Sequence, residues 1–495
     1  MTDRSRAPLA DRDHAAALRE LLQRAGYSRD GIQGALGVSG DLLSRTLERP
    51  IYLRRMADRA GALETLIRLF LLDATVEPEV AERAFAPTGL EPLVALGLIE
   101  ERAGELHGLA RVVPHGDIVV ISDQPDREKI HSDHVAGIHR PSITLADLTV
   151  RRPVGTALDM GTGCGIQAIL ASRHAEHVVA TDINERALAF AALNAALNEA
   201  ENIEFRAGSF FEPVAGETFE LVVTNPPYVI SPENAYVFRD SGLGRDRVSE
   251  RLVAELPGFL AEGAFGTIMA SWIHEGDDPS ARPRQWLEGS QCDAWILHTG
   301  IEDPLAAAAN WNRDLAKDEA KYGEAVDRWL AYFREEGIGA LAYGSIVMRR
   351  RTGAANWVRN RELPNEPRRR PEAHLLRLFT GQDLSSDLAS DDALAGLRLA
   401  LAPGATITSR LRRREDEWAE AAEFTLDEGI PFSAELDSFT AQFLARLDGT
   451  TSLGDVLAAF AVQHQAPADQ VRASGLQMAR SMLEQGFAEP RTAEI

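Results

Sequence analysis

The chain has 495 residues, which is more than one hydrophobic core organises, so we expect two to four domains. Its formal net charge of −23 argues against broad, nonspecific attraction to nucleic acid, so any nucleic-acid contact is expected to be local. Two cysteines exclude a disulfide framework, and no apolar run is long enough for a signal core or a membrane span, so the sequence predicts a cytoplasmic protein.

Residues 1–120 are predicted to form the first domain. The segments LADRDHAAALRELLQRAG and SRDGIQGALG have helical spacing and end at glycines, and SGDLLSRTLERP predicts a helix that ends before Pro50. An apolar helix over ALETLIRLFLLDATV and short strands close the region. Helices followed by a small hairpin are typical of a winged helix, which binds DNA or RNA in some proteins and docks substrate or packs in others. The acidic charge favours docking here.

Three histidines, His131, His134 and His139, lie close together in HSDHVAGIH. No cysteine lies near them and no second pair of ligands follows, so we expect no metal site.

A glycine-rich turn stands between two short apolar strands. The first strand ends at Asp159, the turn carries Gly161, Gly163 and Gly165, and the second strand, HVVATD, ends at Asp182. Glycines let the backbone approach a ligand, and a carboxylate at the second strand end can hold ribose hydroxyls. The sequence therefore predicts a nucleotide-binding βαβ unit. The dinucleotide fingerprint requires a third glycine where Ile166 stands, so NAD is not the expected ligand.

The segment FELVVTNPPYVI places Asn225, Pro226, Pro227 and Tyr228 after a buried strand. Neither proline can donate to a ladder, so the strand stops there and two carbonyls turn outward. With the Asn225 side-chain oxygen, these acceptors suit a planar NH₂ group stacked on the Tyr228 ring, with its lone pair directed to an electrophile. The alternative for these four residues alone is an ordinary strand-to-loop turn.

The pattern D-x-G-x-G-x-G, the acidic second strand end and NPPY, in this order, resemble the class I methyltransferases that bind S-adenosylmethionine. Residues from about 130 to 350 are similar to the small-domain group, which includes the release-factor glutamine methyltransferases and the adenine-N6 nucleic-acid methyltransferases. The resemblance implies an α/β fold with a Rossmann-like, seven-stranded core over residues 121–375. Related guanine-N2 enzymes carry phenylalanine and histidine after the prolines, where this chain has Tyr228 and Val229, so guanine is disfavoured.

The resemblance also implies roles for individual residues. The catalytic tetrapeptide is Asn225, Pro226, Pro227 and Tyr228. The cofactor loop and ribose-binding acid are Asp159, Gly161, Thr162, Gly163, Gly165 and Asp182. The remaining cofactor contacts implied are Phe210 or Ile183 around the adenine, Ser209 at its amino edge, and Arg140 and Ser142 at the methionine end, together with Asn225. The alternative for Phe210 is packing in the core.

Between the expected sixth strand, CDAWILHTG, and the seventh, LAYGSIVMRRR, lies a helical insertion at about residues 302–337. Insertions on a common α/β core are where substrate choice is usually built. The arginines from Arg349 to Arg370 form the one strongly positive stretch, which is either a phosphate-binding edge or a solvated hairpin.

Residues 376–495 are predicted to form a third domain of three helices and a closing strand. The LDG-TTSL turn and the final LEQGF resemble the small winged-helix domains of the PqqD peptide-chaperone type.

These features predict an S-adenosylmethionine-dependent N-methyltransferase without a metal or membrane partner. Its macromolecular acceptor is interpreted as an adenine N6 in structured RNA, because of the arginine stretch and the winged-helix-like first domain. The alternative is a protein glutamine N5, which the net charge and the third domain favour. A non-catalytic, cofactor-sensing winged-helix regulator is the alternative of another class.

Overall fold

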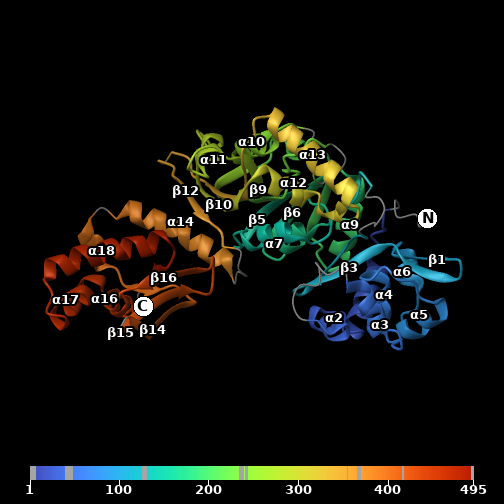
Figure 1. The fold of residues 1–495 in the computed structure, drawn as a ribbon, viewed down its shortest axis with the longest axis horizontal. Coiled ribbons are helices and arrows are strands. Elements are labelled where there is room, and N and C mark those ends of the chain that lie inside the picture. The colour runs from blue at the N-terminus through green and yellow to red at the C-terminus, as the bar shows by residue number, and fades with distance from the viewer. Residues whose placement is uncertain are drawn as a thin grey trace. The chain divides into compact units, whose positions relative to one another are not determined.

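The computed structural model describes residues 7–38, 48–124, 131–233, 239, 243–353, 355–364, 370–388, 390–414 and 417–491. The chain divides into two compact units (Figure 1). The first contains the residues up to Ala146 and Arg152–Glu362, and the second contains Asp147–Arg151 and the residues from Leu363 onward. Among the described residues, no helix is both long and apolar enough to cross a membrane.

The first unit begins with short, capped helices. The Asp11 side chain caps α1 (Arg12–Arg24) by accepting from the His14 amide, and Ser28 caps α2 (Arg29–Leu36) in the same way. The helix expected over SGDLLSRTLERP falls mostly outside the described residues. The helix found there, α3 (Arg49–Arg55), does not end before Pro50 but carries it in its first turn, where its missing N–H costs nothing.

A winged-helix arrangement follows, as expected. The helix α4 (Ala62–Phe70) leads to a bridge between Val76 and Leu106, then come α5 (Pro78–Phe85), α6 (Glu91–Ala95) and the hairpin of β1 (Ile99–Arg102) with β2 (Glu105–Gly108). The hairpin lies close to α4, because a Cβ on Gly108 would stand 2.2 Å from the Leu69 carbonyl oxygen. In winged helices that bind DNA, the helix that corresponds to α6 is the recognition helix, which enters the major groove. Here α6 has five residues and none is basic.

A second hairpin joins this region to the central sheet. It consists of β3 (Ala110–His115) and β4 (Ile118–Asp123), and it lies on α9 (Glu185–Leu197). The Asn194 side chain accepts from the Ile121 amide and donates to the Ile121 carbonyl, both at 2.7 Å. Asn198 does the same with Val119, at 2.9 and 2.7 Å. These two amides satisfy the free edge of β4 as a neighbouring strand would.

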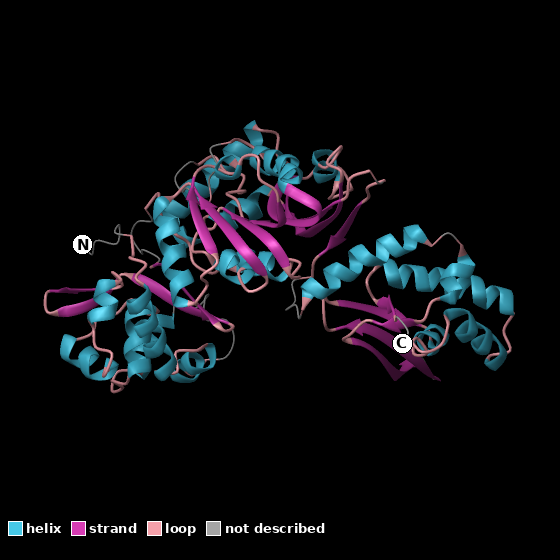
Figure 2. Ribbon diagram, turned by 180° about the vertical axis from the view of Figure 1, so that it is seen from behind, coloured by secondary structure: helices cyan, strands magenta, loops and turns pink. Residues whose placement is uncertain are grey.

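The central sheet has eight strands in the order β12-β10-β11-β9-β8-β5-β6-β7, with helices on both faces (Figure 2). Its strands are β5 (Val154–Met160), β6 (Ala175–Asp182), β7 (Ile203–Ala207), β8 (Phe219–Thr224), β9 (Leu260–Ile273), β10 (Cys292–Glu302), β11 (Leu341–Arg350) and β12 (Val358–Glu362). All neighbours pair in parallel except β11, which is antiparallel to both β9 and β10. The seven expected strands are therefore present in the Rossmann-like order, and β12 adds an edge strand.

The remaining helices of the first unit connect or cover these strands. They are α7 (Arg140–Asp147), α8 (Ile166–Ala171), α10 (Arg247–Glu255), α11 (Ala281–Trp286), α12 (Pro304–Trp311) and α13 (Glu319–Glu335), with 3-10 turns at Glu212–Val214, Leu256–Phe259 and Arg313–Lys317. The helices α12 and α13 occupy the insertion between β10 and β11. We call α12, the 3-10 turn and α13 the helical insertion.

The second unit begins earlier than residue 376, with α14 (Pro371–Asp387). It continues with α15 (Asp391–Gly396), β13 (Leu399–Leu401), β14 (Ala405–Arg414), β15 (Glu417–Leu426), β16 (Phe432–Leu436), α16 (Ser438–Leu444), α17 (Leu453–Gln463), α18 (Ala468–Glu484) and β17 (Ala488–Pro490). The last three helices and β17 match the expectation. The antiparallel meander β14-β15-β16 was not expected, because β14 carries a run of arginines.

Candidate functional site

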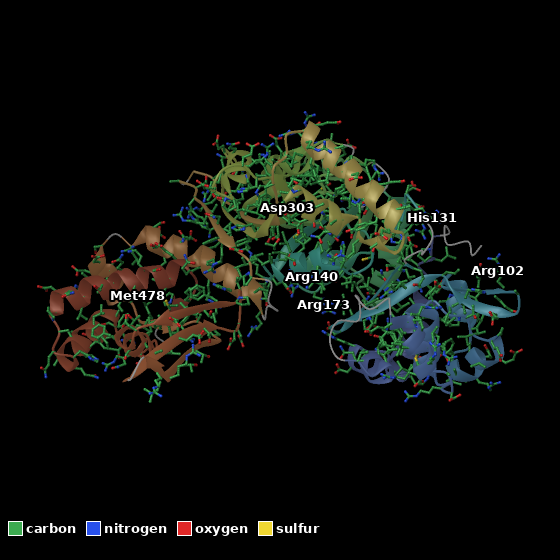
Figure 3. All side chains as sticks on the ribbon, viewed as in Figure 1. Arg102, His131, Arg140, Arg173, Asp303 and Met478 are labelled. Carbon is green, nitrogen blue, oxygen red and sulfur yellow. The ribbon has the colours of Figure 1, made fainter. Side chains whose placement is uncertain are left out.

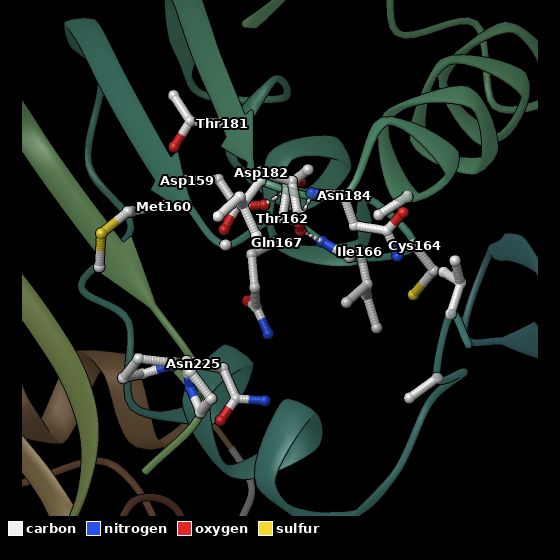
Figure 4. Close-up of a pocket in the computed structure, with 18 of the residues that line it drawn as sticks. Asp159, Met160, Thr162, Cys164, Ile166, Gln167, Thr181, Asp182, Asn184 and Asn225 are labelled. Carbon is white, nitrogen blue, oxygen red and sulfur yellow. Dashed lines mark hydrogen bonds between the residues drawn. The ribbon is translucent and has the colours of Figure 1, made fainter. Parts of the chain in front are cut away.

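A pocket of about 350 Å³ lies at the carboxyl ends of β5, β6, β7 and β8 (Figure 4). In parallel α/β sheets this edge is where ligands bind. The sequence-predicted residues that line it are Ser142, Asp159, Gly161, Thr162, Gly163, Asp182, Ile183, Ser209, Phe210, Asn225, Pro226 and Pro227. Three others, Arg140, Gly165 and Tyr228, are not among its lining residues.

Asp159 fixes the glycine-rich turn at the end of β5. Its Oδ2 accepts a hydrogen bond from the Thr162 hydroxyl at 2.6 Å and another from the Ala168 amide at 2.9 Å. Burial raises the pKa of Asp159 to about 7, although both hydrogen bonds oppose the shift. Asp159 therefore joins the turn to the start of α8.

The three glycines of the turn have different functions. Gly161 and Gly163 adopt φ of 72° and 54°, and a Cβ added to either would meet nothing within 4 Å. They permit the left-handed turn and leave the pocket open. Gly165, at φ 84°, faces α9, where an added Cβ would stand 2.9 Å from Ala191. The structure therefore assigns Gly165 to helix packing instead of direct ligand contact.

Asp182 ends β6 and belongs to the same turn. Its Oδ2 accepts from the Gly163 amide and its Oδ1 from the Asn184 amide, both at 2.9 Å. Burial raises its pKa, while these backbone hydrogen bonds oppose the shift. A carboxylate has about four acceptor sites, so Asp182 retains capacity for ligand hydroxyls.

Apolar side chains stand beside this carboxylate. Ile183 is 60% exposed although it is fully apolar, and it lines the pocket with Phe210, Ser209 and Gly208. The guanidinium of Arg251 covers the Phe210 ring, with its Cζ atom 5.3 Å from the ring centroid. The pair Ile183 and Phe210 suits a planar heterocycle next to ribose hydroxyls.

Asn225 stands across the pocket from Asp182, and the Gln167 side chain extends between them (Figure 4). The Asn225 Oδ1 atom is buried and accepts no hydrogen bond from any described residue. An unsatisfied buried acceptor costs about 1 to 3 kcal/mol, so this atom is prepared for a donor that enters from outside. This observation favours a binding site over an ordinary strand-to-loop turn.

The rest of the tetrapeptide differs in part from expectation. The Pro226 carbonyl is not free, because it accepts from the Tyr228 amide at 2.8 Å. The Tyr228 carbonyl accepts from the Ser271 hydroxyl. The Tyr228 side chain is buried, which raises its pKa, and it belongs to the core cluster behind the pocket. One of the two expected outward carbonyls is thus used to hold Tyr228 in place.

The lead-in segment contributes more to the pocket than the sequence indicated. Ser142 is buried, bonds to His139, and its carbonyl accepts from Gln167 Nε2 at 2.7 Å. Arg140 is exposed at the start of α7 (Figure 3). The lining residues that the sequence analysis missed are His134, Val135, Ala136, Gly137, His139, Met160, Cys164, Ile166, Gln167, Thr181, Asn184, Ala187 and Gly208.

Asp123 at the end of β4 holds this lead-in segment. Its carboxylate accepts from the Val135 amide at 2.7 Å and forms a buried ion pair with Arg186. His134 Nδ1 lies 3.6 Å from the same carboxylate, and burial lowers the His134 pKa. Within the described part of the chain, no three His, Cys, Asp or Glu side chains are grouped to bind a metal. Of the three histidines, His134 and His139 line the pocket and His131 does not.

Arg349 and Arg350 end β11 at the edge of the sheet opposite to the pocket. Arg359 and Arg361 stand on the edge strand β12, and neither lines the pocket. Because β11 is antiparallel, Leu341 pairs with Ile273 at the pocket edge, whereas Arg349 pairs with Phe265 at the other end of β9. Arg349 and Arg351 also form ion pairs with the buried Asp293, at 2.6 and 3.1 Å. Arg368 and Arg369 fall outside the described residues. The described start of this stretch therefore does not provide a phosphate-binding edge beside the pocket.

Residues 141–240 match the family model of the methyltransferase small domain, and residues 24–109 match a domain of unknown function (DUF7059). The chain is 43% identical over 94 residues to a release factor glutamine methyltransferase of Cereibacter sphaeroides, covering 18% of this chain and 34% of the relative. It is 42% identical over 84 residues to a ribosomal protein uL3 glutamine methyltransferase of Xanthomonas campestris, covering 17% of this chain and 27% of that relative.

Among solved structures, ribosomal protein L11 methylase from Lactobacillus delbrueckii subsp. bulgaricus aligns with 44% of this chain and 81% of its own, at 19% identity and a TM-score of 0.27. The chain spans about a third to a half of the length of the first curated relatives that it matches.

Proposed function

Because the central domain belongs to the methyltransferase small-domain family of class I S-adenosylmethionine-dependent methyltransferases, we propose that this protein methylates a planar amide nitrogen, that of a glutamine side chain in a protein. The observation that carries the proposal is the buried Asn225 Oδ1, which no described residue satisfies and which lines the same pocket as Asp182. A primary amide offers two N–H donors and a flat face, and it suits an acceptor oxygen next to an aromatic ring.

The residues of the pocket fit the cofactor. The turn with Gly161 and Gly163 leaves open space beside the backbone, Asp182 has acceptor capacity for ribose hydroxyls, and Ile183 with Phe210 would flank the adenine. Asp159, whose pKa burial raises to about 7, lines the same pocket, and a cationic group bound near it would favour its ionised form. When bound, S-adenosylmethionine supplies a methyl group on a sulfonium, which is already a strong electrophile.

In this proposal, the residues of the chain align the substrate nitrogen with the methyl group of the cofactor. Asn225 Oδ1 would accept one amide N–H of the substrate, which would orient the nitrogen and increase the electron density that it presents to the methyl group. The displaced amide proton leaves to water. Holding the two reactants in line accounts for several kcal/mol of the barrier, so no strong general base is required. Tyr228, fixed by its own amide and carbonyl, lies in the core behind the pocket and supports the chain that carries Asn225.

The choice of a protein acceptor over RNA rests on three findings. Several of the relatives that match are named glutamine methyltransferases. None of the described arginines from Arg349 to Arg370 lines the pocket, and α6 of the winged-helix region has no basic residue. The net charge of −23 adds repulsion of a polyanion. The structured-RNA acceptor expected from the sequence thus loses its two main supports, and the glutamine alternative is the better one.

The test is transfer of labelled methyl from S-adenosylmethionine into lysate of cells that lack the protein. The label should resist nuclease, disappear with protease, and be recovered as N5-methylglutamine in mass spectra of digested protein. Label that is lost to nuclease and recovered as N6-methyladenine would show a nucleobase acceptor. The Asn225→Ala variant, assayed in parallel, reports background labelling.

A further inference from the structure

The helical insertion packs against the core that holds the catalytic tetrapeptide. Trp329 and Phe333 of α13 are 0% and 1% exposed, and they belong to the same hydrophobic cluster as Tyr228. Their rings meet edge to face, with centroids 6.0 Å apart. The insertion is therefore a fixed part of the fold behind the tetrapeptide, and its outer face carries the exposed charges.

Glu233 lies five residues after Tyr228, and its side chain joins the segment after the tetrapeptide to the helical insertion. Its Oε1 accepts from the Arg328 guanidinium at 2.6 Å and from Trp329 Nε1 at 3.3 Å. Its Oε2 accepts from Arg239 at 2.7 Å. The Glu233 side chain is 19% exposed, and although burial opposes the shift, the bonds from Arg328 and Arg239 lower its pKa.

Two more contacts tie the insertion to the same side of the site. The Tyr332 hydroxyl of α13 accepts from the Arg245 amide at 2.8 Å, just before α10. Trp311 of α12 donates its Nε1 hydrogen to the Tyr343 hydroxyl at 3.1 Å. Burial raises the pKa of Tyr343, the hydrogen bond from Trp311 opposes the shift, and the charges of Glu302 and Tyr228 add to it. The described chain on both sides of residues 234–238 is thus anchored to α13.

We propose that Glu233 is a positioning residue that couples the helical insertion to Asn225 and Tyr228, so that the insertion sets the acceptor side of the active site. The inference rests on the proposed methyl transfer. The tetrapeptide is followed by the buried Val229 and Ile230, and Glu233 then fixes the chain through three side-chain donors. The cofactor side is built upstream, from Asp159 to Phe210. Loosening Glu233 should therefore affect the acceptor and leave the cofactor undisturbed.

The acceptor that this arrangement fits is a protein segment. The insertion carries more acidic than basic residues between Asp303 and Glu336. A net negative insertion repels a polyanion and attracts a basic polypeptide. The chemical class inferred for the substrate is thus a glutamine within a neutral or basic peptide stretch.

The experiment compares Glu233→Gln, Arg328→Gln and a matched control, Glu324→Gln, on the full chain. Glu324 is an exposed glutamate of the same helix. We expect Glu233→Gln and Arg328→Gln to lower kcat for labelled methyl transfer to protein about tenfold, with S-adenosylmethionine affinity within twofold of wild type by calorimetry. The double variant should lose little more than Glu233→Gln alone, because both changes remove one interaction. Glu324→Gln should behave as wild type.

Hydrogen exchange of the peptide that covers residues 225–233 provides a readout independent of activity. It should speed up in Glu233→Gln and Arg328→Gln but not in the control. If exchange and kcat are unchanged in both variants, or if cofactor affinity falls as much as kcat, the inference is overturned. If wild-type protein transfers no methyl group, the proposed function fails, whereas exchange still decides whether Glu233 holds the tetrapeptide. Arg328 is half-exposed, so its variant remains informative if Glu233→Gln does not fold.

Discussion

The carboxylate of Asp182 accepts a 2.9 Å hydrogen bond from the backbone amide of Gly163. This bond joins the end of β6 to the glycine-rich turn after β5, so the residue that would hold the ribose also holds the loop that would pass beside the cofactor. Binding and loop geometry are therefore coupled through one side chain.

Asp182→Ala should weaken S-adenosylmethionine binding tenfold or more, since a hydrogen bond to a charged group contributes about 1.5 to 3 kcal/mol and the loop also loses its anchor. Calorimetry with S-adenosylmethionine and with NADH measures both affinity and selectivity. Unchanged affinity in the variant, or tight NADH binding by wild type, contradicts the cofactor assignment.

Asn225→Ala should leave cofactor affinity near the wild-type value and reduce methyl transfer by roughly two orders of magnitude, because it removes an acceptor that meets the substrate amide in the transition state. The variant should not be less stable, since the missing oxygen has no partner among the described residues. Single-turnover kinetics at saturating S-adenosylmethionine measures the rate of methyl transfer. A wild-type rate in this variant would mean that Asn225 and the turn that carries it have no role in catalysis.

Cofactor affinity should rise as the pH increases through about 7. Burial raises the pKa of Asp159 to about 7 in the free protein, and a bound cation would favour its ionised form, so binding releases a proton. The same shift means that Asp159 contributes stability that is fully present below its unfolded pKa and lost as the pH rises through 7. Calorimetry in buffers of different ionisation enthalpy measures the number of protons released when the cofactor binds. Asp159→Asn should abolish the pH dependence of cofactor affinity and that of stability near pH 7. If cofactor affinity still depends on pH in this variant, another group is responsible.

Arg349→Gln should lower stability and leave the kinetic constants of methyl transfer unchanged. Arg349 pairs with the fully buried Asp293 at 2.6 Å, and losing one of its two arginine partners costs about 1 to 3 kcal/mol. Thermal denaturation and transfer assays well below the melting temperature separate the two effects. A higher KM for the acceptor at unchanged stability would indicate that the arginine stretch binds substrate after all.

Much of the site was predictable because its signals are local in sequence. Asp159, the glycines and Asp182 lie within one βαβ unit, whose strand-turn-helix geometry follows from residue types at fixed spacing. The tetrapeptide after a buried strand is local in the same way. The order of the core strands followed from these elements and the resemblance that they support.

Elements that form by pairing distant segments were missed. The strand β12 and the meander β14-β15-β16 contain polar or arginine-rich sequences, and they become strands because neighbours in space complete their hydrogen bonds. The wall of the pocket from His134 to Gly137 is also non-local, since Asp123 of another hairpin holds it.

The sequence by itself determined the nucleotide-binding unit and the chemistry of its residues, because backbone conformation and side-chain type act over a few positions. Tertiary structure alone decided which groups meet. It turned β11 antiparallel and so placed Arg349 at the edge away from the pocket, it used the Pro226 carbonyl to fix Tyr228, and it brought Glu233 onto the helical insertion. Strand direction and side-chain partners depend on packing between segments far apart in the chain, which local spacing does not encode.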